Sequence, residues 1–122
     1  MSGVALQSYR ELRVWQEAMR LAEMSYELTR SFPREEMFGL TGQIRRAASS
    51  VPANIAEGYG RGGRKEYVQF LFMAQGSLKE LETHLLLATR VGCCLDNQIV
   101  AAMRQAEAVG KMLRSMIRKL RS

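Results

Sequence analysis

The chain contains only two cysteines, and their positions argue against a protein held together by disulfides or by a structural zinc ion. Cys93 and Cys94 are adjacent, which is poor geometry for a mutual disulfide, and no second pair exists that could complete a zinc site. We therefore expect two reduced thiols near a turn and a cytoplasmic protein.

Proline, long hydrophobic runs and strand-like alternation are also scarce. Only two prolines occur among 122 residues that are rich in Ala, Leu, Met, Glu, Arg and Gln, which is an all-α composition. No run approaches the 18 or so apolar residues of a membrane span, and residues 1–9 lack the apolar core of a signal peptide. We expect neither a membrane-embedded nor an exported protein, with a flexible segment over residues 1–10 and one domain over residues 11–122.

Residues that could perform catalysis or bind a metal are few. The single histidine, His84, follows Glu80 by one helical turn, but a metal centre in a helix bundle needs further ligands from facing helices, and no Glu-x-x-His pair exists. The glycines at 58, 60, 62 and 63 do not match a phosphate-binding loop, and no predicted strand precedes them. There is no nucleophile elbow and no supported Cys–His arrangement. The sequence therefore predicts a protein that is not an enzyme, with no metal and no cofactor.

Apolar residues that recur every three or four positions predict four helices, over about residues 12–29, from between 33 and 39 to about 58, 64–91 and 96–120. In the first helix the expected buried line is Leu12, Trp15, Met19, Ala22 and Tyr26, widened by Val14, Ala18, Leu21 and Leu28. Gly92 is the expected C-terminal cap of the third helix, and Asp96 the expected N-cap of the fourth. Short connections between four such helices predict an all-α, antiparallel up-down-up-down four-helix bundle.

Pro52 lies inside the second predicted helix. A proline there removes one backbone hydrogen bond and costs roughly 3 kcal/mol in an unadapted helix. The apolar spacing nevertheless continues from Val51 to Ile55. We therefore favour a helix that is kinked at Pro52 over two separate helices.

Positive charge is unevenly distributed along the chain, whose net charge is +6. Residues 45–65 hold five cations and one anion, and residues 104–121 hold six cations and one anion. Such surpluses favour polyanionic partners, with nucleic acid ahead of membrane headgroups, although a basic surface can also serve solubility alone. The candidate nucleic-acid-binding residues are Arg45, Arg46, Arg61, Arg64, Lys65, Arg104, Lys111, Arg114, Arg118, Lys119 and Arg121.

Five of these cations each follow an apolar-line residue of the fourth helix by one position: Arg104, Lys111, Arg114, Arg118 and Arg121. They form a stripe about 100° around the helix from the buried line and roughly 25 Å long, which could follow a phosphate backbone. The alternative is a solvated flank whose long side chains cover the edge of the core. Because Tyr67, Phe70 and Phe72 are expected to be used in helix packing, no aromatic stacking platform is predicted, and phosphate contacts should dominate.

A second, largely polar line on the second helix predicts an interface. Small residues on it permit close approach of another helix, from this chain or from another subunit, and opposite charges at its ends could set the register. The candidate interface residues are Gln43, Arg46, Ser49, Ser50, Ala53, Asn54 and Glu57.

Several stretches resemble one protein family. They are residues 11–19, 38–48, 51–61, 64–67 and 76–83, and the most specific is the Pro-Ala-Asn-Ile-Ala-Glu-Gly run at 52–58. Together they resemble the four-helix-bundle proteins encoded in intervening sequences of bacterial large-subunit ribosomal RNA genes. The resemblance covers about residues 9–120. The sequence differs from the family pattern at Glu11, where the family usually has an aspartate, and this difference affects only where the first helix starts.

The resemblance implies a homopentameric ring and an association with nucleic acid. It also implies kinship with the accessory subunits of diversity-generating retroelements, which partner a reverse transcriptase. Two functions remain open at this point. One is an oligomeric nucleic-acid-binding module, RNA-directed or DNA-directed; the other is a scaffolding oligomer that binds a protein partner such as a reverse transcriptase.

Overall fold

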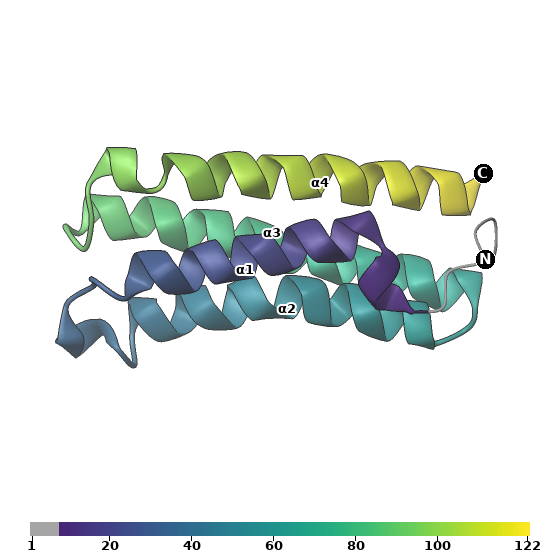
Figure 1. Ribbon diagram of the computed structural model, residues 1–122, viewed down its shortest axis with the longest axis horizontal. Coiled ribbons are helices and arrows are strands. Elements are labelled where there is room, and N and C mark those ends of the chain that lie inside the picture. The colour runs from purple at the N-terminus through teal and green to yellow at the C-terminus, as the bar shows by residue number, and fades with distance from the viewer. Residues whose placement is uncertain (1–7) are drawn as a thin grey trace.

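The computed structural model describes residues 8–122 and contains four α-helices, α1 (Arg13–Thr29), α2 (Leu40–Gly60), α3 (Arg64–Arg90) and α4 (Val100–Arg121). Short 3₁₀ turns, Tyr9–Glu11, Arg34–Glu36 and Asp96–Gln98, precede α1, α2 and α4. No strand occurs within the described residues, so the predicted all-α four-helix bundle is confirmed (Figure 1).

The helices pack around one core with their axes roughly aligned. α2 packs against both α1 and α3, and α4 closes the bundle by packing against α3 and α1. In Figure 1 the chain runs in one direction along α1 and α3 and in the other along α2 and α4. The α2–α3 connection and the C-terminus of α4 therefore lie at the same end of the molecule.

The apolar lines that the spacing predicts in α2, α3 and α4 form most of the core of the bundle. These lines are Leu40, Ile44, Ala47, Val51 and Ile55 in α2; Tyr67, Leu71, Ala74, Leu78, Leu81, Leu85 and Ala88 in α3; and Ile99, Met103, Ala106, Gly110, Leu113, Ile117 and Leu120 leading into and along α4. All of them are buried except Leu40, Tyr67, Met103 and Leu120, which are partly buried. For these three helices, three-and-four spacing of apolar residues was sufficient to identify the buried face.

The predicted buried face of α1 is correct only in part. Val14, Ala18, Leu21 and Ala22 are buried as expected, but Trp15 and Met19 are only half-buried, and Tyr26 is 42% exposed. Two residues that were not predicted, Ser25 and Thr29, complete the core face. Apolarity alone could not separate the two faces, because the true core face includes two hydroxyl side chains.

These hydroxyls are buried without leaving a polar atom unpaired. The Ser25 hydroxyl donates to the Leu21 carbonyl and the Thr29 hydroxyl to the Ser25 carbonyl, each at 2.9 Å. Arg45 Nε on α2 then donates to Thr29 Oγ1, also at 2.9 Å. A buried hydroxyl that bonds its own helix avoids most of the cost of desolvation, so Ser and Thr can occupy core positions.

α2 continues without interruption through Pro52, which is buried. Separate helices on either side of this proline are therefore excluded, while the kink itself stays a prediction. The helix begins at Leu40, whose N–H donates to Glu36 Oε1 at 3.0 Å. It ends at Gly60, two residues beyond the predicted end.

The ends of α3 and α4 differ in how well the sequence predicted them. Gly92 has φ +86°, and the Cys93 N–H donates to the Ala88 carbonyl at 2.9 Å, which is the expected glycine cap of α3. Asp96 is not the N-cap of α4, contrary to prediction. It begins a 3₁₀ turn, and α4 starts at Val100. Ile99 is 5% exposed, so burial of this side chain, and not a capping aspartate, decides where the chain turns into α4.

The start of the chain is described only in part. Of the segment expected to be flexible, residues 1–7 lie outside the described residues. The Tyr9 ring meets the Trp15 ring edge-on, with centroids 5.4 Å apart, so the described chain contacts α1 before residue 11. No helix of residues 8–122 is both long enough and apolar enough to cross a membrane.

α2 and α3 lie in close contact at Gly58. A Cβ at this position would lie 2.7 Å from Phe70 Cβ and 3.3 Å from the Tyr67 carbonyl oxygen. The carbonyl oxygen belongs to the α3 backbone and Phe70 Cβ is bonded directly to it, so these atoms can move away only if the helix moves too. Only glycine fits here without a shift of α3 relative to α2.

We predict that Gly58→Ala destabilises the fold, because overpacking a core contact costs about 1–3 kcal/mol, which exceeds the gain of up to about 1 kcal/mol in helix propensity. Thermal or urea unfolding at a fixed protein concentration measures the change. Gly76→Ala is the matched control, since a Cβ on Gly76 meets nothing within 4 Å. The control should unfold at the wild-type temperature or above it. Equal stability of the two variants would show that Gly58 is not a close-packing site.

Candidate nucleic-acid interface

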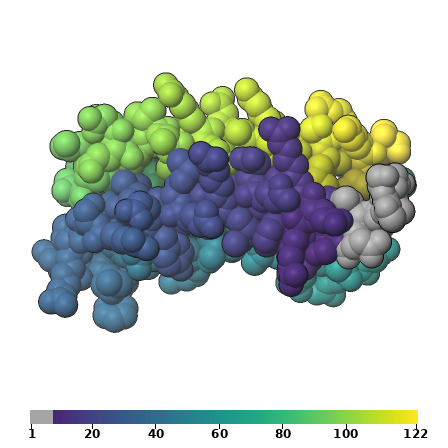
Figure 2. All heavy atoms as spheres, in the orientation of Figure 1, coloured from purple at the N-terminus to yellow at the C-terminus, as the bar shows by residue number. Residues whose placement is uncertain are grey.

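The basic side chains gather at one end of the bundle. Residues 8–20, 50–75 and 108–122, which form this end, hold eleven of the 18 Lys and Arg residues but four of the 12 Asp and Glu residues. Figure 2 shows that the first turns of the described chain and the C-terminal end of α4 lie at this end. The other half of the molecule is close to neutral. Parts of the two basic surpluses, Arg61 to Lys65 and Lys111 to Arg121, are thus separate in sequence but lie at the same end of the fold.

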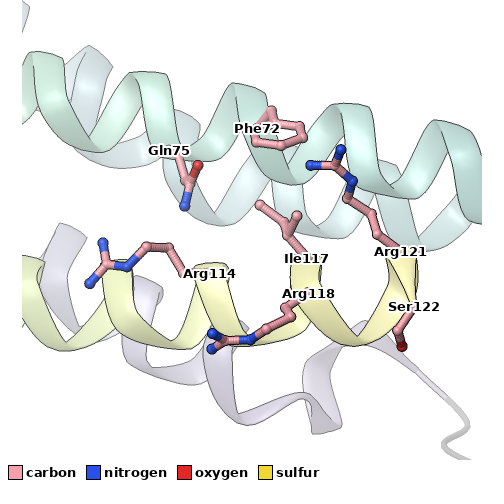
Figure 3. Close-up of a pocket in the computed structure, with 7 residues that line it drawn as sticks. All are labelled: Phe72, Gln75, Arg114, Ile117, Arg118, Arg121 and Ser122. Carbon is pink, nitrogen blue, oxygen red and sulfur yellow. The ribbon is translucent and has the colours of Figure 1, made fainter.

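At this end, a groove of about 560 Å³ runs between α3 and α4. It is lined by Phe72, Gln75, Arg114, Ile117, Arg118, Arg121 and Ser122 (Figure 3). We call it the arginine groove. No acidic side chain lines it, and among the described residues its three arginines form no ion pair.

An aromatic ring lies inside the arginine groove. Phe72 is 45% exposed, and the Arg121 guanidinium carbon lies 5.8 Å from the ring centroid. Figure 3 shows Ile117 and Arg121 extending from α4 toward α3, and Gln75 extending from α3 toward α4. The expectation that Phe72 would be used in helix packing is therefore wrong. Leu71 occupies the core position, and the next residue on the helix points outward.

The groove continues along the two helices past Gly76. A second hollow of about 420 Å³ shares Phe72, Gln75 and Arg114 with the arginine groove, and it is also lined by Gly76, Lys79 and Gly110. Because Gly76 has no side chain and a Cβ there would meet nothing within 4 Å, the floor stays open at this point.

The other two members of the predicted stripe on α4 lie elsewhere. Arg104 borders a hollow that also contains Glu82, Asp96 and Glu107, so its surroundings are of mixed charge. Lys111 borders a hollow between α1 and α4, beside Arg13. The stripe therefore does not form one continuous basic surface.

The candidate cations of α2 and of its connection to α3 divide into two groups. Arg45 is part of the α1–α2 contact, with its guanidinium 4.7 Å from the Tyr26 centroid, which leaves it outside the basic surface. Arg61 pairs with Glu57 at 3.0 Å and lies over the Phe70 ring. Arg64 and Lys65 are exposed at the start of α3, as is Lys119 near the end of α4. Exposed Arg46 donates to Gln43 Oε1 at 2.7 Å.

The predicted interface residues form hydrogen bonds within α2. Ser49 and Ser50 donate to carbonyls one turn earlier, and Asn54 Nδ2 donates to the Ser50 carbonyl at 2.8 Å. Ser49 and Ala53 also line an apolar groove of about 610 Å³ between α1 and α2, together with Trp15. Trp15, Met19 and Tyr26, which were predicted to lie in the core, line this groove instead.

Residues 8–122 contain few side chains that could bind a metal or act as a nucleophile, and they do not cluster around a metal site. No group of three or more His, Cys, Asp or Glu within residues 8–122 could hold a metal ion. His84 Nε2 lies 4.0 Å from Glu80 Oε2, which is at the outer edge of an ion pair. Burial raises the pKa of the Cys93 and Cys94 thiols, and Glu36 adds to this at Cys93, so both thiols are protonated at neutral pH and are poor nucleophiles.

Comparison with known proteins identifies the fold and the family. A search of curated proteins finds no match. A solved structure of a protein of unknown function from the S23 ribosomal protein family of Bacteroides thetaiotaomicron has a similar fold. Its TM-score is 0.76 and its identity 23%, over 85% of this chain and 97% of that chain. The model of the 23S rRNA-intervening sequence protein family matches residues 10–115. The chain therefore belongs to the 23S rRNA-intervening sequence protein family.

Proposed function

We propose that this protein is a non-enzymatic, oligomeric nucleic-acid-binding module that binds RNA through the basic end of the bundle. The observation that carries the proposal is the arginine groove, which is lined by three exposed arginines and by no acidic side chain. Guanidinium groups suit phosphate oxygens because their N–H donors match them in pairs. A cytoplasmic location fits this partner and the two free thiols.

The contacts of one subunit predict weak and largely sequence-independent binding. Arg114, Arg118 and Arg121 could each neutralise one phosphate, and the affinity that the release of counterions contributes falls as the salt concentration rises. Oligomerisation would repeat the basic end in every subunit. A single RNA that reaches two such ends gains affinity without any new type of contact.

A second function, scaffolding through a protein partner, is supported by exposed apolar side chains. Phe38 is 99% exposed in the α1–α2 connection, next to the exposed Met37. Leu86, Leu87 and Val91 add an exposed apolar surface toward the end of α3. Such surfaces commonly mark contacts with other proteins, either further copies of this chain or a different partner.

We predict a stable homo-oligomer, because the exposed apolar side chains of α3 and the small-residue line of α2 need a partner surface. The resemblance to the family implies five subunits. Light scattering at micromolar concentration should then report about five times the 13.8 kDa of one chain. A mass of 13.8 kDa would contradict the oligomer.

We predict that RNA binding depends on salt and on the arginine groove. The triple variant Arg114→Glu, Arg118→Glu, Arg121→Glu should bind RNA at least about tenfold more weakly at low salt. The slope of log affinity against log salt should flatten by about 0.7 for each phosphate of a single strand that the variant no longer neutralises. Fluorescence anisotropy with labelled RNA over a salt series measures both quantities, and light scattering checks that the oligomer is intact.

The control is the triple variant Arg30→Glu, Arg34→Glu, Arg90→Glu. It makes the same change in net charge with three exposed arginines of the near-neutral half. Its affinity should fall much less. An equal decrease in both variants would mean that net charge alone governs binding. Absence of RNA and DNA binding by the wild type at low salt would favour the scaffolding function instead.

A further inference from the structure

The arginine groove contains more than phosphate binding requires. Phosphate contacts need exposed cations, and these do not have to lie in a hollow. Here the cations border a groove that also holds a half-exposed aromatic ring, Phe72, and an amide, Gln75. An aromatic face contacts a base and not a phosphate, and an amide can pair with the edge of that base.

We propose that the arginine groove binds an unpaired nucleotide, with its base stacked on Phe72 and the adjoining phosphates held by Arg114, Arg118 and Arg121. This inference rests on the proposed nucleic-acid binding and names the form of nucleic acid that the site selects. In a duplex both faces of each base are covered by neighbouring bases. Only an unpaired base can therefore place its face on Phe72.

The size of the groove agrees with this ligand. Its volume of about 560 Å³ lies within the range of small-molecule sites, roughly 300–1,000 Å³. The adjoining hollow past Gly76, of about 420 Å³, extends the site in the direction that a single strand would follow along α3 and α4. Lys79, at the far side of this hollow, forms an exposed ion pair with Glu82 at 3.2 Å, which offers little resistance to a competing phosphate.

The chemistry of the lining agrees as well. Arg121 already lies over Phe72 as a cation over a ring, and guanidinium groups stack on bases as they do on aromatic side chains. A base that enters the groove can take the place of Arg121 on the ring, which frees this guanidinium for a phosphate. Ile117 is 6% exposed and contributes only a small apolar part of the lining, while the Gln75 amide offers both a donor and an acceptor to the edge of the base.

The test compares Phe72→Leu with the wild type on two labelled RNAs of equal length, one single-stranded and one in a perfect duplex. Leucine keeps the apolar volume and removes the stacking face. Removal of one base–aromatic stack weakens binding by about fivefold or more. We expect this decrease for the single strand and an unchanged affinity for the duplex. A duplex has a higher charge density than a single strand, so the two RNAs bind with different affinities even to the wild type. The comparison therefore uses, for each RNA, the affinity of the variant divided by that of the wild type, measured by anisotropy at one low salt concentration.

Two further variants separate stacking from other effects. Phe38→Leu removes an exposed aromatic side chain of the α1–α2 connection and should change neither affinity. Gly76→Leu fills the open floor of the groove without changing any charge, and it should weaken binding of the single strand selectively. Light scattering must report the same oligomer mass for every variant.

The outcomes distinguish the inference from the proposed function. If Phe72→Leu leaves single-strand binding unchanged, or weakens both RNAs equally, while the triple arginine variant still weakens binding, the protein binds phosphates without accepting a base and the inference is wrong. A change in oligomer mass on Phe72→Leu would assign Phe72 to a subunit contact and would also overturn it. Failure of the wild type to bind either RNA would reject the proposed function together with the inference.

Discussion

The close packing of α2 against α3 at Gly58 is the constraint on which the remaining arrangement depends. A single additional carbon at this position would approach Phe70 Cβ to 2.7 Å, so the two helices can lie this close only because residue 58 is glycine. With its apolar line directed into the core, α3 presents Phe72 and Gln75 at the boundary with α4, and the arginine groove forms there.

The basic end exists because the four helices alternate in direction. Residues 61–65 and 114–121 are separated by about two fifths of the chain, and the turn between α2 and α3 lies at the same end of the bundle as the last turns of α4 (Figure 1). Gathering like charges in this way is unfavourable for folding by itself, since their repulsion grows as salt is lowered. A bound polyanion would relieve that repulsion. The electrostatic repulsion that destabilises the free protein would then add to the affinity for the proposed RNA partner.

Much of this fold could be predicted from the sequence, because the buried residues of α3 and α4 carry no polar side chain and those of α2 include only one hydroxyl, Thr41. α1 is the exception. Its core face includes Ser25 and Thr29, whose hydroxyls bond carbonyls of their own helix, and hydropathy cannot register that compensation. The start of α4 was misplaced for a related reason: Asp96 suits an N-cap chemically, but burial of Ile99 determines the turn.

The sequence predicted that the candidate site would contain arginines, but it did not predict which cations would gather there or that Phe72 would lie beside them. Local charge counts identified Arg114, Arg118 and Arg121, yet they also selected Arg45, which the α1–α2 contact occupies. Phe72 was missed because its neighbour Leu71 fits the same apolar spacing. A helix with two packing neighbours has a broad apolar face, so the sequence does not reveal which residue at its margin faces solvent. Three-dimensional proximity to the arginines of α4 is the property that gives Phe72 its significance.

The most direct test of this account is to map where RNA contacts the protein. Single-stranded RNA that carries a photoreactive base can be crosslinked to the wild-type protein, and the modified peptides can be identified by mass spectrometry. The account predicts crosslinks in residues 69–79 of α3 and 110–122 of α4, concentrated at Phe72. Crosslinks confined to residues 34–38 and 91–98, at the opposite end of the bundle, or spread evenly over the surface would contradict it.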